Sequence, residues 1–177
     1  MPKNVLVLSA SPRMRGNLDM LCDQFIKGAE AAYNIAEKIY VHHQVIGTCR
    51  ACYVCKTAGT CVQKDDMPSI LEKMIAADVI VLATPVYFYM MNGQLKILID
   101  RTLSRYTEIC NKEFYFIATA AEEKASMEST MDSLRGFTDC LPGATIKGLI
   151  YGSSVWQKGA IQGNKSMQEA MEMGMGV

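Results

Sequence analysis

The chain has little that would draw it to nucleic acid or to a membrane. Its 18 Lys and Arg residues are balanced by 18 Asp and Glu residues, and no basic stripe stands out along the sequence. No net field therefore attracts nucleic acid or an anionic bilayer. The longest apolar run, residues 79–91, is too short to span a bilayer and contains Pro85. We expect neither a nucleic-acid partner nor a membrane partner.

Targeting and linker features are equally scarce. The first residues lack the charged region and small-residue cleavage site of a secretory signal, which favours a cytoplasmic location. Thiols stay reduced there, so a disulfide framework is not expected. Only two histidines are present, at 42 and 43, too few to build a histidine metal site. Without repeats or linkers, residues 1–177 are predicted to form a single domain, long enough for a substantial core.

What is present is an alternation of short apolar runs with stretches of helical periodicity. Apolar runs rich in β-branched residues predict buried strands, and apolar residues three and four apart predict helices. The strands are expected at 5–9, 35–41, 78–83, 113–119 and 145–151. The helices are expected at 18–33, after a cap at Asp65 or Asp66, and at 93–103, 127–141 and 161–175.

This alternation is typical of a parallel sheet with right-handed crossovers and helices on both faces. It predicts an α/β three-layer sandwich with a five-stranded parallel sheet in the flavodoxin-like order 2-1-3-4-5. Ligands of such sheets bind at the carboxyl ends of the strands, where the strand order reverses. The segments to search for function are therefore 9–17, 84–89 and 119–122.

The segment after the first strand, "SASPRMRGN", has the equipment to hold an anion. Free backbone N–H groups at a helix start favour negative charge, and a glycine lets the backbone turn tightly. The segment is neither a Walker loop nor a GxGxxG motif, so a monophosphate suits it better than a triphosphate or a dinucleotide. The alternative is an ordinary capping loop with solvated arginines. Its donors and cations are Ser9, Ser11, Arg13, Arg15 and Asn17, with Gly16 as the turn residue.

The segment after the third strand, "TPVYFYMMNGQLKILIDR", places aromatic residues at the same edge of the sheet. Tyr87, Phe88 and Tyr89 follow a buried strand, and a flat ring system would suit them. Asn92 can cap the next helix, and Gly93 permits close backbone approach. The alternative is that these aromatics pack under that helix or at a subunit interface.

Four cysteines occur in the spacing C-x2-C-x2-C-x5-C, within a loop insertion at about 47–64. They are Cys49, Cys52, Cys55 and Cys61. Such a run can wrap an iron–sulfur cluster. Zinc, a dithiol–disulfide switch at Cys52 and Cys55, and a reduced loop packed at a subunit interface are alternatives. Asp65 and Asp66 follow the run, and helix capping explains them better than acid–base chemistry does.

Taken together, "SPRMRGN", "TPVYFYMMNGQLKILIDR" and the four cysteines closed by "CVQKDDM" resemble the NADPH-dependent FMN reductase group of flavodoxin-like proteins. Within that group they are most similar to the iron–sulfur flavoproteins, over residues 4–120. The resemblance implies non-covalent FMN. Its phosphate would be held by Ser9, Ser11, Arg13, Gly16, Asn17 and Leu18. Its isoalloxazine ring would be flanked by Thr84, Pro85, Val86, Tyr87, Phe88, Thr119, Ala120 and Ala121.

One position departs from the pattern of the group. Similar members often carry Thr or Ser where this chain has Leu18, so a hydroxyl donor to the phosphate is missing. The backbone N–H of residue 18 remains. We therefore expect either weaker FMN binding or compensation by Arg13.

The resemblance further implies a [4Fe–4S] cluster on Cys49, Cys52, Cys55 and Cys61 that passes single electrons to FMN. The expected activity is that of an NAD(P)H-dependent FMN oxidoreductase that reduces a small acceptor such as a quinone or flavin. No catalytic side chain is needed, since the cofactor does the chemistry. A ferredoxin could replace NAD(P)H as donor. Similar proteins form dimers and tetramers, so a homodimer or homotetramer is expected.

Two other functions remain open from the sequence. One is a flavodoxin-type electron carrier that turns over no small substrate. The other is a phosphate-binding module whose cysteine loop is stabilised by zinc.

Overall fold

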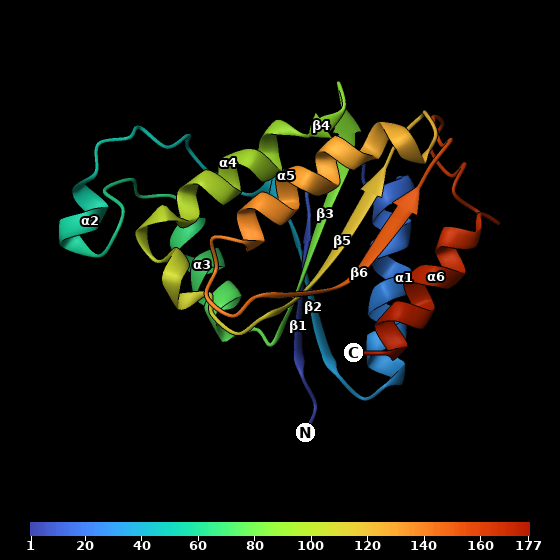
Figure 1. The fold of residues 1–177 in the computed structure, drawn as a ribbon, viewed down its shortest axis with the longest axis horizontal. Helices are drawn as coiled ribbons and strands as arrows, with labels where there is room; N and C mark the ends of the chain where they lie inside the picture. The colour runs from blue at the N-terminus through green and yellow to red at the C-terminus, as the bar shows by residue number, and fades with distance from the viewer.

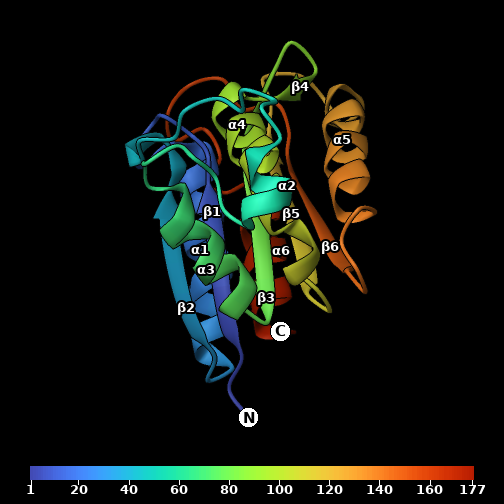
Figure 2. The same ribbon diagram turned by 90° about the vertical axis from the view of Figure 1, so that its left-hand side faces the viewer.

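The computed structural model describes residues 1–177, which fold around one twisted sheet (Figure 1). Its parallel strands lie in the order β2-β1-β3-β5-β6, which confirms the predicted order 2-1-3-4-5. Figure 2 shows β2 and β6 at the two edges of the sheet. The parallel strands are β1 (Asn4–Ser9), β2 (Ile35–Tyr40), β3 (Val79–Tyr87), β5 (Glu113–Thr119) and β6 (Thr145–Gly152).

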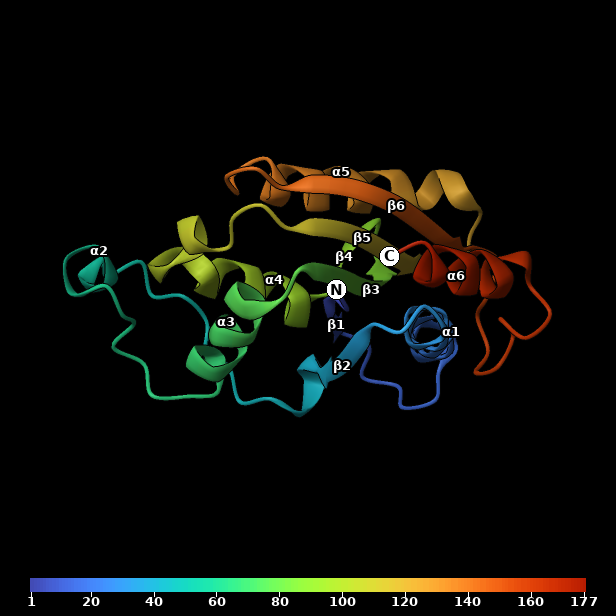
Figure 3. The same ribbon diagram turned by 90° about the horizontal axis from the view of Figure 1, so that it is seen from below.

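Helices cover both faces of the sheet (Figure 3). One face carries α1 (Asn17–Ala31) and α6 (Lys165–Met175). The other carries α3 (Met67–Ala76), α4 (Gly93–Arg101) and α5 (Glu128–Thr138). No helix has both the length and the apolar character that crossing a bilayer requires. The short elements are α2 (Val54–Ala58) and the 3-10 turns Val41–His43, Thr102–Ser104, Tyr106–Glu108 and Lys124–Met127.

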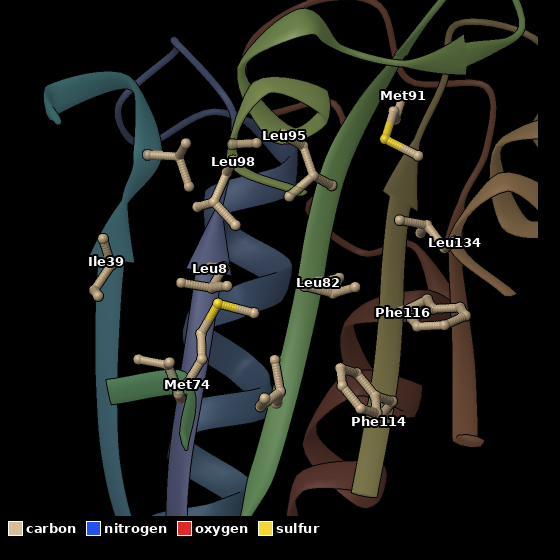
Figure 4. Packing of buried hydrophobic residues seen from close by; sticks show 14 of the residues in the cluster. Leu8, Ile39, Met74, Leu82, Met91, Leu95, Leu98, Phe114, Phe116 and Leu134 are labelled. Atoms are coloured by element: carbon tan, nitrogen blue, oxygen red, sulfur yellow. The ribbon is translucent and has the colours of Figure 1, made fainter. Parts of the chain in front are cut away.

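Two hydrophobic clusters hold the layers together, because successive strand residues point to opposite faces. Leu8, Leu82 and Phe116 pack toward α3, α4 and α5 (Figure 4). Their neighbours Val7 and Val81 pack toward α1 and α6. All five side chains are fully buried, and each contributes about 1.5–3 kcal/mol relative to an exposed position.

The third strand, predicted to end at residue 83, is longer than expected. β3 continues through Tyr87 and turns back into a short antiparallel strand, β4 (Met90–Met91). The two turn residues, Phe88 and Tyr89, both have positive φ, at 49° and 64°. This is the two-residue hairpin geometry that normally selects Asn-Gly, so the sequence carried no turn signal there.

The two helices on one face of the sheet approach each other at glycines. A Cβ atom on Gly28 of α1 would lie 2.1 Å from the carbonyl oxygen of Met171 on α6. A Cβ atom on Gly174 would lie 2.1 Å from the carbonyl oxygen of Phe25 on α1. Because no larger residue fits at either position, α1 and α6 pack backbone against backbone.

Candidate functional site

A cavity of about 510 Å³ opens at the carboxyl ends of the parallel strands, within the size range of small-molecule sites. We call it the rim cavity. Four connecting segments contribute its walls, and the three segments singled out from the sequence are among them. The wall residues are Ser11, Arg13, Asn17, Leu18, Pro85, Val86, Tyr87, Phe88, Tyr89, Thr119, Ala120, Ala121, Glu122, Ser126, Val155 and Trp156.

The first wall is the turn that leads from β1 into α1. Gly16 is the N-cap of α1, and its Cβ would lie 2.9 Å from the carbonyl oxygen of Arg13, so the turn has no room for a side chain. Gly16 supplies no capping side chain. The backbone N–H groups of Asn17 and Leu18 therefore have no acceptor in the protein. Such free donors, at the positive end of the helix dipole, can bind an anion.

Arg13 stands beside these donors without an acidic partner. Its only side-chain hydrogen bond runs from Nη1 to the carbonyl oxygen of Trp156, at 3.3 Å. Ser11 is nearly buried, and its Oγ accepts a hydrogen bond from the Arg13 N–H at 3.1 Å. Ser11 thus fixes the backbone of Arg13, the Trp156 carbonyl holds its guanidinium, and no acidic side chain compensates the positive charge.

The side chain of Asn17 is engaged in hydrogen bonds that the sequence did not predict. Its Oδ1 accepts from the N–H of Gly159 at 2.9 Å, and its Nδ2 donates to the carbonyl oxygen of Gln157, also at 2.9 Å. The side chain therefore ties the start of α1 to the segment after β6. Asn17 does not cap α1, because Gly16 holds the cap position.

A buried charge group supports the same turn from behind. Asp19, which is 2% exposed, accepts from the N–H of Arg15 at 2.7 Å and from Lys38 Nζ at 2.6 Å. Burial lowers the pKa of Lys38, but its hydrogen bonds to Asp19 and Asp23 outweigh this and hold the pKa above its usual range. Lys38 thus stays charged and holds Asp19 where it fixes Arg15 in its left-handed conformation, at a φ of 53°.

The second wall is the β3–β4 hairpin, and Asn92 anchors it. Asn92 is 1% exposed and donates from Nδ2 to the carbonyl oxygen of Ala10, at 2.6 Å. Its own N–H donates to Thr84 Oγ1 at 3.0 Å, and its Oδ1 caps α4 at the N–H of Leu95. One amide side chain thus connects the end of β1, the end of β3 and the start of α4.

The third wall follows β5. Thr119 and Ala120 are almost buried, whereas Ala121 and Glu122 are exposed and their N–H groups have no acceptor in the protein. The N–H groups of Phe88 and Tyr89, across the cavity, are also free. Unused backbone donors on facing walls can bind the polar edge of a planar ring.

Three predicted residues lie behind the cavity rather than on its wall: Ser9, Gly16 and Thr84. Ser9 is fully buried beside the Cys22 thiol, and its hydroxyl makes no hydrogen bond of normal geometry. Five wall residues were not predicted to bind the cofactor: Tyr89, Glu122, Ser126, Val155 and Trp156. Tyr89 belongs to the aromatic run already noted. Trp156 reaches the cavity only because Asn17 ties its loop down, a contact that no local pattern reveals.

The cysteine segment, residues 49–61, lies elsewhere. It contains α2, which projects at the opposite end of the molecule from α1 and α6 (Figures 1 and 3). Cys49 and Cys52 are exposed, Cys55 and Cys61 are half-buried, and all four are unbonded thiols. No three His, Cys, Asp or Glu side chains stand close enough together to hold a metal ion. The donor set has the chemistry of a cluster site, but its sulfurs are not gathered.

The base of this segment is closed by a buried ion pair. Arg101 Nη1 and Nη2 donate to the two carboxylate oxygens of Asp65, at 2.6 and 3.1 Å, and Nη1 also reaches the carbonyl oxygen of Gly47 at 2.7 Å. Asp65 additionally accepts from the N–H groups of Gly47 and Met67. Burial raises the pKa of Asp65, but these hydrogen bonds outweigh it and lower the pKa below its usual range.

The expectation of capping at Asp65 and Asp66 is right in part. Asp65 does bond the first N–H of α3, and its main role is the ion pair. Asp66 holds the N-cap position without a side-chain cap, and it accepts from the N–H of Val45 instead.

Cys22 is a thiol of the core. It is fully buried under the β1–α1 turn, and burial raises its pKa to about 12. It therefore remains a protonated thiol at neutral pH and is not a candidate redox group.

Comparison with known proteins agrees with this geometry. The family described as NADPH-dependent FMN reductase matches residues 3–157. An iron–sulfur flavoprotein of Methanocaldococcus jannaschii is 33% identical over 135 residues, which cover 75% of this chain and 70% of that protein.

Two solved structures share the fold. RosB, solved with 8-demethyl-8-formylriboflavin-5′-phosphate bound, has a TM-score of 0.77 at 18% identity, covering 98% of this chain and 76% of RosB. An NAD(P)H:quinone oxidoreductase of Methanothermobacter marburgensis has a TM-score of 0.74 at 14% identity, covering 99% of this chain and 96% of that one. At these identities the likeness establishes the fold alone.

Proposed function

This chain belongs to the NADPH-dependent FMN reductase family, and we propose that it is an oxidoreductase that holds FMN in the rim cavity. The observation that carries the proposal is the juxtaposition of an unpaired cation, free helix N–H groups and an aromatic hairpin around one cavity. The cation and the helix N–H groups match the phosphate of FMN, and the aromatic hairpin matches its flat ring. The residues present therefore fit the cofactor.

The phosphate would bind at the start of α1, to the N–H groups of Asn17 and Leu18 and to the Arg13 guanidinium. The hydroxyl missing at Leu18 is offset by that residue's own free N–H. The Leu18 side chain is buried in the core. Ser9 and Thr84 would act from behind the wall, by keeping the strand ends in place.

The ring would lie between the β3–β4 hairpin and the Thr119–Ala121 segment. When bound, FMN supplies hydride and electron transfer, chemistry that no side chain of the chain provides. Free N–H groups of Ala121 and Glu122 on one wall and of Phe88 and Tyr89 on the other would stabilise negative charge on the polar edge of the ring. We assign no catalytic acid or base.

A titration of the purified protein with FMN tests the cofactor assignment. We expect stoichiometric binding and an absorption spectrum of bound flavin, with riboflavin binding far more weakly because it lacks the phosphate. Equal affinity for FMN and riboflavin would contradict the proposed phosphate site. Absence of flavin binding would contradict the whole proposal.

We further propose NAD(P)H as electron donor and a small molecule such as a quinone or free flavin as acceptor. Family membership supports an enzyme over a flavodoxin-type carrier. Steady-state NAD(P)H oxidation with a quinone separates the two, since a carrier sustains almost no turnover.

For the cysteine segment we propose a [4Fe–4S] cluster on Cys49, Cys52, Cys55 and Cys61. The support is the compact cysteine spacing and the iron–sulfur flavoprotein among the relatives. The four thiols have the right chemistry, and closing the site requires the segment to fold inward. Metal analysis of anaerobically reconstituted protein tests this proposal: iron with acid-labile sulfide supports it, and stoichiometric zinc without iron contradicts it.

We also propose that the chain assembles as a homodimer or homotetramer. Phe88 is 98% exposed and Trp156 73% exposed, and both line the rim cavity, which is unusual for aromatic residues without a partner. A second copy would cover them. A monomer by light scattering with FMN bound would contradict this proposal.

A further inference from the structure

The loop between β6 and α6, residues 153–164, lies against the start of α1 and is held there by few contacts. Val155 and Ile161 of this loop are buried in the core, whereas the residues between them are mostly exposed. Only two side chains from outside the loop form hydrogen bonds with those exposed residues, the side chains of Arg13 and Asn17. The position of this part of the loop therefore depends on two residues at the phosphate end of the rim cavity.

Asn17 uses all of its side-chain hydrogen-bonding groups on this loop. Its Oδ1 accepts from the N–H groups of Gly159, at 2.9 Å, and Ile161, at 3.3 Å. Its Nδ2 donates to the carbonyl oxygens of Gln157, at 2.9 Å, and Val155, at 3.4 Å. A side-chain amide has two N–H donors and one oxygen with two acceptor positions, so none is left for a ligand. Only the backbone N–H of Asn17 remains free to bind an anion.

The loop in turn holds the side chain of Arg13. The carbonyl oxygen of Trp156 accepts from Arg13 Nη1 at 3.3 Å, and it is the only acceptor that this guanidinium has in the protein. Trp156 directly precedes Gln157, whose carbonyl oxygen is bonded to Asn17. A series of contacts thus runs from Asn17 through the loop to Arg13. It restricts a long side chain that would otherwise lose rotamer freedom when it binds an anion.

We propose that Asn17 is a positioning residue for the phosphate of FMN, which acts through the Trp156 carbonyl on the Arg13 guanidinium and does not touch the phosphate with its own side chain. This inference rests on the proposed FMN site. A guanidinium has five N–H donors, so Arg13 can keep its bond to Trp156 and still hold an anion. Restricting the cation before the ligand arrives lowers the entropy cost of binding. Because such coupling is reciprocal, a bound phosphate must stabilise the loop in return.

A double-mutant cycle with Asn17→Ala and Arg13→Ala tests the inference, with flavin affinity measured by quenching of flavin fluorescence. We expect Asn17→Ala to weaken FMN binding about three- to tenfold, because one ordering contact is lost, and to leave riboflavin binding unchanged. In protein that already carries Arg13→Ala, the Asn17 substitution should weaken FMN binding no further. Asn164→Ala, which removes a cap at the far end of the same loop, is the matched control and should bind FMN as the wild type does.

Three outcomes of this cycle would overturn the inference. An equal loss from Asn17→Ala with and without Arg13 would mean that Asn17 acts independently of the cation. An equal loss for riboflavin would mean that Asn17 shapes the cavity wall and not the phosphate site. A loss in Asn164→Ala as large as that in Asn17→Ala would mean that any loosening of the loop has the same effect.

Trp156 gives a second measurement, because it is the only tryptophan of the chain and its fluorescence reports on the loop directly. Inorganic phosphate should raise the fluorescence anisotropy of Trp156 in the wild type, a result that does not depend on how a variant folds. The same titration of Arg13→Ala should leave the anisotropy unchanged. No change in the wild type, at phosphate concentrations that displace FMN, would overturn the inference.

Failure of the flavin proposal gives a different result. Wild-type protein that binds FMN no more tightly than riboflavin would overturn the phosphate site and the role of Asn17 with it. Wild-type protein that prefers FMN, together with an Asn17→Ala variant that prefers it equally, would overturn the role of Asn17 alone.

Discussion

The rim cavity and the cysteine segment differ in how firmly the fold holds them. The strand ends around the cavity are fixed by buried hydrogen bonds, with Asn92 connecting three elements and Asn17 tying down the segment after β6. Residues 49–61 make no hydrogen bond of normal geometry to any residue outside the segment. They also hold Ala51 and Tyr53 at positive φ, which costs about 1 kcal/mol each.

The difference indicates when each site is formed. The rim cavity is preorganised, because burial of the sheet fixes its walls before any cofactor arrives. The cysteine segment is closed only at its base, by Arg101 and Asp65, so a bound metal, as proposed, would have to order the rest of it. Binding in the rim cavity would therefore cost little conformational entropy, whereas binding to the cysteine segment would cost much more.

The largest expected effect comes from removing the anchor of the cavity. Asn92→Ala should lower the free energy of unfolding by about 3 kcal/mol, because it removes a helix cap and strands the buried oxygen of Ala10. Urea denaturation measures this loss. Asn164→Ala, which removes only the cap of α6, is the matched control and should cost about 1 kcal/mol. Equal losses in the two variants would mean that Asn92 is an ordinary cap.

Asp65→Asn tests the base of the cysteine segment. Loss of the buried ion pair should cost about 2 kcal/mol at neutral pH. The pKa of Asp65 is lowered in the folded state, so its contribution is present above the unfolded value of about 4 and is lost as the pH falls through the folded value. Urea denaturation of both proteins across this range should therefore show the difference shrinking in acid. A constant difference would show that the charge of Asp65 is not what stabilises the fold.

Arg13→Ala tests the rim cavity through its affinity for FMN rather than through the free energy of unfolding. Removing an unpaired cation from the phosphate site should weaken FMN binding about tenfold, or about 1.4 kcal/mol. Quenching of flavin fluorescence measures it. Riboflavin, which has no phosphate, serves as the control ligand and should bind both proteins alike. A similar loss for riboflavin would place Arg13 against the ring instead.

The smallest effect is expected in the exposed part of the cysteine segment. Cys52→Ser should change the stability of the metal-free protein by less than about 0.5 kcal/mol, because the thiol contacts little. Cys22→Ser, which buries a hydroxyl in the core, should cost about 1–3 kcal/mol and serves as the contrast. Thermal melts of the two variants give the comparison, and a large loss for Cys52→Ser would mean that the segment is folded on its own.

Much of the fold could be predicted because its central strands, β1, β3 and β5, are buried on both faces. Residues 114–118 are apolar without interruption, and the predicted strand, 113–119, matches β5 at both ends. The strand order followed from the alternation of strands with helices, and it placed the ligand segments at one edge of the sheet. The predicted start of the last helix, at 161, was wrong. Asn164 caps α6 and accepts from the N–H of Ser166, so α6 begins at Lys165.

What could not be predicted depends on contacts between residues far apart in the chain. The β3–β4 hairpin has aromatic turn residues in place of Asn or Gly, so only tertiary packing specifies it. Asn17 was predicted to bind the phosphate. Its side chain is hydrogen-bonded to backbone groups some 140 positions away, in a segment that has no motif of its own. The ion pair between Asp65 and Arg101 likewise joins residues 36 positions apart, and no sequence pattern reveals it. Local sequence patterns predict helices and strands. Contacts between side chains far apart in the sequence can be identified only in the packed structure.

The close approach of α1 and α6 also sets an order of events during synthesis. The residues that would hold the phosphate are translated early, but the helix they precede rests on Gly174, near the end of the last helix. A nascent chain leaves the ribosome from its amino end, so α1 cannot pack against α6 until α6 has emerged. The β1–α1 turn is therefore expected to reach its final packing only after α6 has been translated, so a chain that stops before Lys165 should form an incomplete rim cavity.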